Sequence, residues 1–264
     1  MPPRMPFPPC SDPYTMDFQV EVFDELPSTN TWLYNCALQK PEGYCVQALR
    51  QSSGKGRFGN GWASPPGNLY LSVLLKPDCD LGRGGQITFC IAVSLTETVL
   101  KFVPDKNLLK LKWPNDLLLN DKKIAGILLE SASRNNGRVD FIVAGIGLNI
   151  YGQSECHAKL SDIQSFNADI DDIRDEFLKT LKKNYESWCT KGFENIRQRW
   201  LLYAKGIGET IIVRLPECRF EGTFRTLDKD GCLLLEREDK KTNKMITQKI
   251  SAGEISFGQQ NKSE

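Results

Sequence analysis

The chain has 264 residues, of which 40% are hydrophobic and 25% are charged, and its formal net charge is only +1. These values are typical of a folded globular protein and argue against a disordered chain, which combines low hydrophobicity with high net charge. The near-neutral balance lacks the strong basic excess of most nucleic-acid-binding proteins. The length predicts one large domain, or a large domain with a small partner.

The two ends of the chain are predicted to lie outside the folded domains. Residues 1–16 are rich in proline and contain no apolar signal-peptide core, and they are expected to form a disordered tail, as are residues 259–264. No apolar run approaches the roughly 20 residues of a membrane span. We therefore expect a cytoplasmic protein with no membrane partner.

Hydrophobic periodicity predicts a mixture of strands and helices over residues 17–205. The expected strands are 18–22, 45–49, 68–76, 109–113, 117–119 with 123–130, and 139–146. The expected helices are 28–39, 84–102, 170–188 and 193–203. Most strands are joined by short turns or a single helix, which favours an α+β domain with a mixed or antiparallel sheet. The oligomeric state stays open, since an edge strand such as 139–146 could pair across a dimer or be covered.

The pattern changes after Gly206 to short β runs. These are expected at 210–215, 218–227, 231–236 and 245–250. Asp230-Gly231 is a typical hairpin turn. Residues 206–258 are therefore predicted to form a small β-barrel or sandwich that follows the larger domain.

Histidine and cysteine usage excludes several catalytic classes. His157 is the only histidine, so a Ser-His-Asp triad or a Cys-His pair would have to use it, and no G-x-S-x-G elbow occurs. The nine cysteines are scattered without a C-x-x-C pair, which argues against a zinc site. Their dispersal predicts buried, reduced thiols in a reducing compartment.

A glycine-rich loop follows the strand at 45–49. Residues 54–59 fit G-x-G-x-x-G, but residues 60–67 cannot open the helix that a dinucleotide site needs, so that site is rejected. The loop carries two cations, Lys55 and Arg57, and Trp62 follows it. Backbone amides and cations of this kind favour phosphate binding, and an indole face suits an adenine ring. The alternative is a surface hairpin with an incidental motif.

Two further segments carry candidate site residues. Residues 112–116, KWPND, form a turn between apolar runs, in which Asn115 can donate and accept hydrogen bonds and Asp116 is suited to a divalent cation. Residues 144–150 end a strand with two glycines, which indicates close approach of a ligand or simply tight packing. For the KWPND segment, the alternative is an ordinary hairpin with charged edges.

Taken together and in this order, these segments resemble the biotin protein ligases. The resemblance rests on Ser28-Thr29-Asn30, Gly54-Lys55-Gly56-Arg57 with Trp62, Lys112 to Asp116, Lys123 to Gly126, and Gly145 to Asn149, and it covers residues 18–255. It implies a class II synthetase-like catalytic domain with a mixed sheet over 17–205 and an SH3-like β-barrel over 206–258. It also implies ATP-dependent attachment of biotin to a lysine of the biotin carboxyl carrier domain of a carboxylase, through biotinyl-5′-AMP.

The resemblance implies a role for each matched residue. The catalytic residues would be Lys123, Arg57 and Lys55, with Asp116 as a Mg²⁺ partner. Biotin would be bound by Ser28, Thr29, Gln51, Gly54, Arg57, Lys123, Gly126 and Gly145. ATP or the adenylate would be bound by Lys55, Arg57, Asn60, Trp62, Lys112, Asn115, Lys123 and Asn149. ATP, Mg²⁺ and the substrate biotin are the small molecules expected, and no nucleic acid.

The chain departs from the family pattern at the glycine loop and before Asp17. Many relatives have GRGR where this chain has GKGR, so Lys55 would contact phosphate as a point charge, and Phe58 and Asn60 occupy positions that are often basic. No helix-turn-helix domain precedes Asp17, which favours a monofunctional ligase. The alternatives are a lipoate–protein ligase, whose R-R-x-x-G-G-G-x-V-like motif is absent, and a catalytically inactive biotin- or nucleotide-binding module.

Overall fold

The structure is a computed structural model that describes residues 16–103, 105–152, 158–215, 217–239 and 242–257. The predicted tail at 259–264, all of the predicted tail at 1–16 except Met16, and His157 lie outside these residues. Met16 itself is buried in the core of the larger domain.

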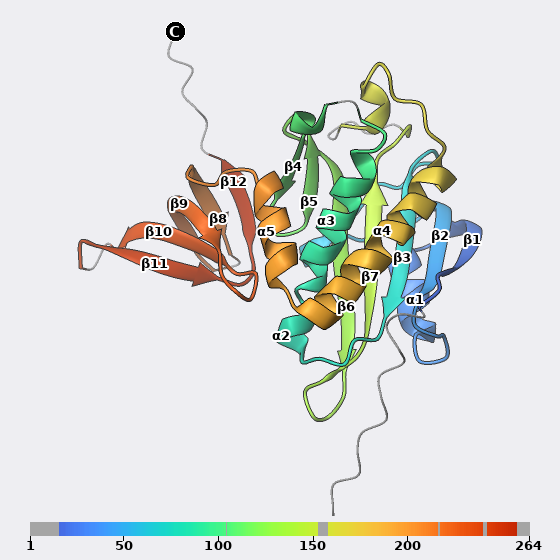
Figure 1. Cartoon of the computed structure of the whole chain (residues 1–264), viewed down its shortest axis with the longest axis horizontal. Coiled ribbons are helices and arrows are strands. Elements are labelled where there is room, and N and C mark those ends of the chain that lie inside the picture. Colours follow the sequence, from blue (N-terminus) through green and yellow to red (C-terminus); the bar gives the residue numbers. More distant parts are fainter. Residues whose placement is uncertain (1–15, 104, 153–157, 216, 240–241, 258–264) are drawn as a thin grey trace, which may run out of the picture.

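The larger domain is built on a seven-stranded mixed sheet (Figure 1). Its strands are β1 (Gln19–Leu26), β2 (Tyr44–Gln51), β3 (Leu69–Leu75), β4 (Leu109–Lys112), β5 (Asp116–Leu119), β6 (Lys122–Ser133) and β7 (Val139–Leu148). They lie in the order β1-β2-β3-β7-β6-β5-β4, and β1 runs parallel to β2 while every other neighbouring pair is antiparallel. The predicted mixed sheet is confirmed.

Helices cover both faces of this sheet. The helices α3 (Ile87–Val99) and α4 (Ile170–Lys191) lie across one face, and α5 (Glu194–Tyr203) packs beside them toward β4 (Figure 1). They share one large apolar core with the inward residues of β3, β6 and β7. The helix α1 (Thr29–Cys36) packs against β2, β3 and β7 in a second, smaller cluster that includes Leu33 and Leu74. Four short helical segments complete the domain: α2 (Leu81–Gly84), η2 (Arg57–Gly59), η3 (Lys106–Leu108) and η4 (Leu160–Asp162).

The alternation of side chains along the strands decides what lies beneath α1. Leu71 and Val73 of β3, like Ala144 and Ile146 of β7, belong to the core under α3 and α4. Because side chains alternate along a strand, the residues between them point to the α1 face. This face therefore carries one serine and three glycines of the central strands: Ser72, Gly126, Gly145 and Gly147. In register, Ser72 pairs with Gly145, and Gly126 pairs with Gly147.

The C-terminal domain is a five-stranded antiparallel sheet. Its strands are β8 (Thr210–Arg214), β9 (Arg219–Leu227), β10 (Leu233–Asp239), β11 (Lys244–Ile250) and β12 (Glu254–Phe257), in the order β11-β10-β9-β8-β12. The strand β12 was not predicted. The Trp113 indole N–H donates to the Gly231 carbonyl at 3.2 Å and ties the two domains together. The α+β class is confirmed, while closure of the second sheet into a barrel stays a prediction.

Two local expectations differ from the structure. The helix expected over 84–102 is shorter at both ends, because α3 spans Ile87–Val99. Gly84 instead ends the separate turn α2, which Asp80 caps by accepting from the Arg83 amide at 2.8 Å. The suggestion that 139–146 forms a sheet edge was wrong: β7 lies between β3 and β6. A fully buried strand and an exposed edge can have similar apolar runs, so periodicity alone does not separate them.

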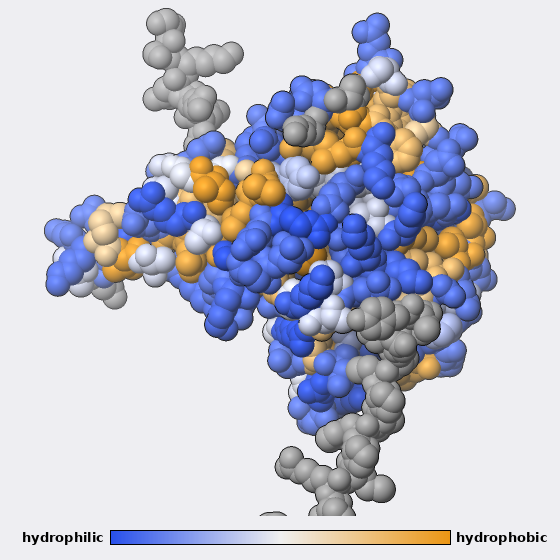
Figure 2. Space-filling model, viewed as in Figure 1, coloured by the Kyte–Doolittle hydropathy of each residue, from blue (hydrophilic) through white to orange (hydrophobic). Residues whose placement is uncertain are grey.

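The surface of the described residues gives no sign of a membrane span. Within those ranges, no helix is both long and apolar enough to cross a bilayer. On the face shown in Figure 2, hydrophilic residues cover most of the large domain, and hydrophobic residues gather in smaller areas, several of them on the C-terminal domain.

Candidate active site

A cavity of about 310 Å³ lies on the α1 face of the sheet, within the usual range for small-molecule sites. It brings together thirteen of the fifteen predicted site residues: Ser28, Thr29, Gln51, Lys55, Arg57, Asn60, Trp62, Lys112, Asn115, Asp116, Lys123, Gly126 and Gly145. They come from the start of α1, the end of β2 and its following loop, the β4–β5 turn, and strands β6 and β7. Segments far apart in sequence thus form one site.

The other two predicted residues, Gly54 and Asn149, lie behind the cavity wall. A Cβ on Gly54 would lie 2.6 Å from the Ser64 hydroxyl and would also overlap the Trp62 carbonyl, so this glycine allows the two arms of the loop to pack. The Asn149 side chain is buried and donates to the Ala158 carbonyl at 3.2 Å. Their predicted contacts with biotin and the adenylate stay predictions.

The glycine loop is a hairpin that forms the roof of the cavity. The Gly56 amide donates to Asn60 at 2.7 Å, and the Trp62 amide donates to Gly54 at 2.8 Å, so the two arms are held together as far as the short turn η2. At that tip Phe58 has a φ of 55° and is 58% exposed. The paired backbone therefore holds Trp62 over the sheet, while the tip is strained and open to solvent.

Trp62 rests on glycines of the sheet. A Cβ on Gly147 would lie 2.6 Å from the indole ring, and one on Gly126 would lie 3.2 Å from both the ring and the Lys123 ammonium. The Lys123 nitrogen lies 5.2 Å from the ring centroid, a cation–π contact. The glycines of these strands therefore make room for side chains of the site itself. The sequence allowed two interpretations of them, close approach of a ligand or tight packing, and the structure shows packing against residues that line the cavity.

Replacing Gly147 by alanine is therefore expected to displace Trp62 and to raise the KM for ATP about tenfold, with a smaller effect on the KM for biotin. The reason is that the new methyl group would overlap the indole, which the rigid sheet cannot relieve. Steady-state kinetics with each substrate varied in turn would measure the change. The control is Gly85→Ala, which lies outside this cavity, is exposed and has a φ of −59°, so that its Cβ would meet nothing nearer than 3.4 Å. An unchanged KM for ATP would remove Trp62 from the nucleotide site.

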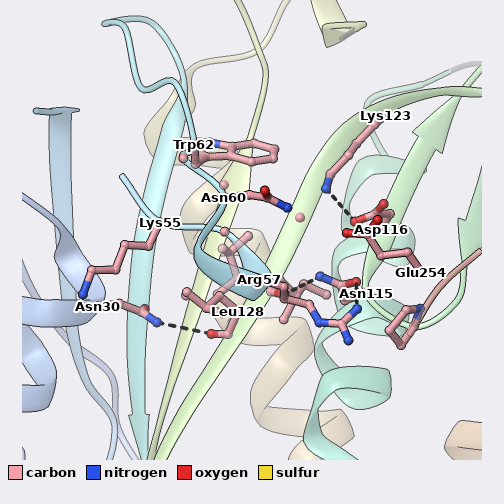
Figure 3. Close-up of a pocket in the computed structure, with 18 of the residues that line it drawn as sticks. Asn30, Lys55, Arg57, Asn60, Trp62, Asn115, Asp116, Lys123, Leu128 and Glu254 are labelled. Atoms are coloured by element: carbon pink, nitrogen blue, oxygen red, sulfur yellow. Dashed lines mark hydrogen bonds and ion pairs between the residues drawn. The ribbon is translucent and has the colours of Figure 1, made fainter. Parts of the chain in front are cut away.

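Lys123 and Arg57 lie at one end of the cavity (Figure 3), and Lys112 lies close enough to Asp116 and Lys123 to interact electrostatically with both. The Lys123 ammonium lies 2.7 Å from an Asp116 carboxylate oxygen. The Arg57 guanidinium donates to the Asn115 side-chain oxygen at 3.1 Å and to the Gly253 carbonyl at 3.3 Å. Asn115 is itself oriented, because its amide donates to the Ile127 carbonyl at 2.7 Å. This end of the cavity can therefore stabilise negative charge on a ligand.

Burial changes the pKa of two cations of the cavity, Arg57 and Lys112. Desolvation lowers the pKa of Arg57 and of Lys112, and the nearby carboxylates of Asp116 and Glu254 oppose part of the shift. A cation that is poorly hydrated and only partly neutralised interacts strongly with an incoming anion. The described residues that line the cavity include four cations and only two carboxylates, so it favours an anionic ligand.

Lys55 stands apart from the other cations. In Figure 3 its side chain extends toward Asn30 and away from the Lys123–Asp116 pair. The residue lines the cavity as predicted, yet it does so from the side of α1. Its predicted part in phosphate binding stays a prediction.

Apart from Lys55, the other end of the cavity is lined by neutral polar groups. The Gln51 side-chain oxygen accepts from the Thr29 amide at 2.8 Å, and its amino group donates to the Ser64 hydroxyl at 2.9 Å. Ser28 caps α1, with its hydroxyl oxygen accepting from the Thr31 amide at 3.3 Å. Uncharged donors and acceptors of this kind suit an amide-like or urea-like ligand group.

Several residues that line the cavity were not predicted to do so. They are Asn30, Gly56, Gly61, Trp113, Pro114, Ile127, Leu128, Ile146, Gly147, Glu254 and Ile255. Most are neighbours of predicted residues and could have been found by extending the motifs. Glu254 and Ile255 belong to β12 of the other domain, and no local signal in the sequence links them to the site.

The carboxylates fit a magnesium ion only together with a phosphate ligand. Among the described residues, no group of three or more His, Cys, Asp or Glu side chains could hold a metal by itself. Mg²⁺ commonly binds through one or two carboxylates, substrate phosphates and water. Asp116 and Glu254 are the two carboxylates that line the cavity, so they match that pattern.

Comparisons with known proteins agree with this site. The model of the biotin/lipoate A/B protein ligase family matches residues 22–149, and that of the biotin protein ligase C-terminal domain matches residues 206–258. A bifunctional ligase/repressor of Bacillus spizizenii is 33% identical over 75% of this chain, which spans 63% of that protein. A biotin–[acetyl-CoA-carboxylase] ligase of Paracoccus denitrificans is 33% identical over 81% of this chain and 90% of its own length.

A solved structure has the same fold. The biotin protein ligase of Aquifex aeolicus, in complex with biotin and ATP, superposes with a TM-score of 0.75 and 25% identity, covering 90% of this chain and 97% of its own. The matched segments include the glycine loop, the KWPND turn and the C-terminal sheet described above. On these grounds, the chain belongs to the biotin protein ligase family.

Proposed function

We propose that this chain uses ATP to attach biotin to a specific lysine of a carrier protein. The observation that carries the proposal is the arrangement of the cavity. Apart from Lys55, its α1 end has neutral hydrogen-bonding groups, and Arg57 and Lys123 lie at the other end with Lys112 beside them. Biotin has the matching polarity, with a neutral urea ring at one end and a carboxylate at the other. The cavity is large enough for such a ligand.

The first step joins two negatively charged groups. A biotin carboxylate oxygen attacks the α-phosphorus of ATP, the bond from that phosphorus to the β-phosphate oxygen breaks, and pyrophosphate leaves with the electron pair. Lys123 and Arg57 offset the repulsion between carboxylate and phosphate and stabilise the charge that develops on the phosphoryl oxygens. Mg²⁺, held by Asp116 and by phosphate oxygens, would neutralise the departing pyrophosphate.

The second step transfers the acyl group. A neutral lysine amine attacks the carbonyl carbon of biotinyl-5′-AMP, the bond from that carbon to the phosphate oxygen breaks, and AMP leaves. The amine loses a proton as the amide forms. The hairpin roof of residues 54–62 limits the access of water to the anhydride, which would otherwise be hydrolysed.

The partner in this proposal is the biotin carboxyl carrier domain of a biotin-dependent carboxylase. The name of the Paracoccus denitrificans relative, a biotin–[acetyl-CoA-carboxylase] ligase, supports that choice. We further propose that the protein acts in the cytoplasm without a nucleic-acid or membrane partner. The near-neutral charge supports this, as do the seven described cysteines, which are all free.

We place the boundary between the catalytic domain, residues 17–205, and the C-terminal domain, residues 206–258, after Lys205. The Lys205 amide donates to the carbonyl of Leu111 on β4 at 2.8 Å, so Lys205 is still bonded to the sheet of the larger domain. The next strand, β8, begins at Thr210. The second family match also begins at residue 206, which supports the same division.

Release of pyrophosphate tests the proposal directly. The full chain with ATP and Mg²⁺ is expected to release pyrophosphate with biotin but only at background rate with lipoate or with no acid. Release with lipoate instead would favour the lipoate–protein ligase alternative. Folded protein that binds biotin yet releases nothing with either acid would make the chain an inactive binding module. Labelling of a purified carrier domain would then test the second step.

A further inference from the structure

A chain of buried polar side chains lies behind the neutral end of the cavity. It runs from the half-buried Glu130 on β6 through the buried residues Asn30, at the start of α1, and Ser72, on β3, to Thr29. Ser72 is 0% exposed, and Asn30 and Thr29 are 4% and 5% exposed. Thr29 and Asn30 line the cavity, but Ser72 lies behind them. Buried polar groups of this kind are retained when they are hydrogen-bonded to one another.

The hydrogen bonds fix which way the Asn30 amide points. Its amino group donates to the Leu128 carbonyl at 3.3 Å and to a Glu130 carboxylate oxygen at 3.0 Å (Figure 3 shows the first). Its oxygen must therefore face Ser72, at 2.6 Å. The room for this amide comes from Gly145, the strand partner of Ser72, because a Cβ on Gly145 would lie 2.8 Å from the Asn30 carboxamide carbon.

This orientation decides where two hydroxyl protons go. The Asn30 oxygen can only accept, so the single Ser72 hydroxyl proton is committed to it. The Thr29 hydroxyl lies 2.8 Å from the Ser72 oxygen and 3.2 Å from the Gln51 side-chain oxygen. Because the Ser72 proton is already used and the Gln51 oxygen can only accept, the Thr29 proton goes to one of these two oxygens, of which Ser72 is the nearer. The lone pairs of Thr29 that remain are then available to a ligand as acceptors.

The neighbouring Gln51 amide has the complementary orientation. Its oxygen accepts from the Thr29 backbone amide at 2.8 Å, and one of its two N–H groups donates to Ser64 at 2.9 Å. Among the described residues no partner is recorded for the second N–H group. Thr29 and Gln51 thus present an acceptor beside a donor at the lining of the cavity.

We infer that Ser72 and Asn30 are positioning residues that hold the Thr29 hydroxyl as an acceptor beside the Gln51 donor, so that the cavity selects a cyclic urea edge. Such an edge offers an N–H next to a C=O, which matches the pair. A dithiolane ring, as in lipoate, offers neither group. The inference rests on the proposed function, because it assigns the neutral end of the cavity to the urea ring of biotin.

The test is Ser72→Ala, which removes the nearer of the two acceptors for the Thr29 proton and leaves only the longer contact with Gln51. The KM for biotin, and its Kd measured by calorimetry without ATP, are expected to rise about tenfold, the effect of one hydrogen bond lost at a buried site, while the KM for ATP stays within twofold. The matched control is Ser94→Ala on α3, which removes an equally buried hydroxyl, one that donates to the Cys90 carbonyl at 2.8 Å beneath the opposite face of the sheet. It should lower the Tm without changing either KM.

A double-mutant cycle separates positioning from a general loss of structure. Thr29→Val alone should weaken biotin binding, and adding Ser72→Ala to it should change the Kd by less than twofold, because Ser72 acts through Thr29. A further tenfold loss in the double variant would contradict the inference. So would an unchanged biotin Kd in Ser72→Ala.

A second variant, Gly145→Ala, tests the inference independently in case Ser72→Ala does not fold. Gly145→Ala would push the Asn30 amide out of place, and the same selective loss of biotin affinity is expected. If Ser72→Ala does not fold, an unchanged biotin Kd in Gly145→Ala overturns the inference by itself. A wild-type chain that binds biotin without releasing pyrophosphate would refute the proposed function but not the positioning role. Absence of biotin binding by the wild-type chain would refute both.

Discussion

Replacing Lys123 by alanine is expected to reduce biotin-dependent pyrophosphate release about a thousandfold, the usual effect of removing a group that stabilises developing charge. The Lys123 ammonium is placed between two parts of the site, 2.7 Å from Asp116 and 5.2 Å from the Trp62 ring centroid. In the proposed reaction it lies where the carboxylate of biotin meets the α-phosphate of ATP.

Loss of this cation acts in two ways. It removes the positive charge that offsets the repulsion between the two substrates, and it leaves the carboxylate of Asp116, which is only 15% exposed, without its partner. The free carboxylate would add a negative charge at the point where negative charge develops. Binding of both substrates should therefore weaken along with the rate, although the repulsion grows most in the transition state.

Initial rates of pyrophosphate release, measured with each substrate near saturation, would check this expectation. The matched control is Lys122→Ala, which removes an exposed ammonium one residue earlier on β6, on the other side of the strand. It should retain wild-type turnover. If Lys123→Ala released pyrophosphate at more than a tenth of the wild-type rate, Lys123 would have no essential part in the adenylation step. Circular dichroism would establish that the variant is folded.

Local sequence patterns were sufficient for most of the site. The KWPND turn was predicted to lie between apolar runs, with strands at 109–113, 117–119 and 123–130, and β4, β5 and β6 are indeed antiparallel neighbours. The loop at 54–59 was predicted not to open a long helix, and only the three-residue turn η2 follows its first glycines. These outcomes depend on glycine, proline and turn residues, whose conformational preferences act over a few residues.

The contacts that close the site could not be predicted in the same way. Glu254 reaches the cavity only because β12 pairs with β8 and the C-terminal sheet packs beside α5 and the KWPND turn. Nearly 200 residues separate Arg57 from its acceptor Gly253, and no periodic pattern reports a contact between domains. The same limit applies to β7, whose apolar run fits a central strand as well as an edge.

The positions of individual cations also depend on tertiary structure. Lys55 and Arg57 are two residues apart in a loop, and both were predicted to contact phosphate. The hairpin geometry directs only Arg57 toward Asn115, whereas Lys55 extends toward α1. Lys55 belongs to the paired arm, whereas Arg57 begins the turn η2, so the two side chains do not follow one strand alternation, and the motif alone does not specify where the arm ends.

Replacing Arg57 by glycine is expected to speed the escape of biotinyl-5′-AMP about 10- to 100-fold, so that labelled biotin appears on unrelated lysines. The Arg57 guanidinium joins three parts of the molecule: the glycine loop that carries it, Asn115 in the KWPND turn, and the Gly253 carbonyl of the C-terminal domain. Hydrogen bonds to a charged group contribute about 1.5–3 kcal/mol each. Losing even one of them would therefore speed release of the adenylate by about 10- to 100-fold.

The measurement is a chase of enzyme-bound labelled adenylate with unlabelled biotin, together with labelling of a bystander protein that has no carrier domain. Arg57→Ala is the informative companion variant, because it removes the same guanidinium without adding the backbone freedom of glycine. If the contacts to Asn115 and Gly253 retain the adenylate, the two variants should leak equally. If Arg57→Ala behaves like the wild type and only Arg57→Gly releases the adenylate, backbone stiffness of the loop would account for retention instead.

The control is Arg50→Ala, which removes an arginine that pairs with Glu25 near the end of β2. It should change neither the chase nor the bystander labelling. If both Arg57 variants retained the adenylate as well as the Arg50→Ala control does, the glycine loop would hold the intermediate without Arg57. The Arg57 cation would then serve only the adenylation step.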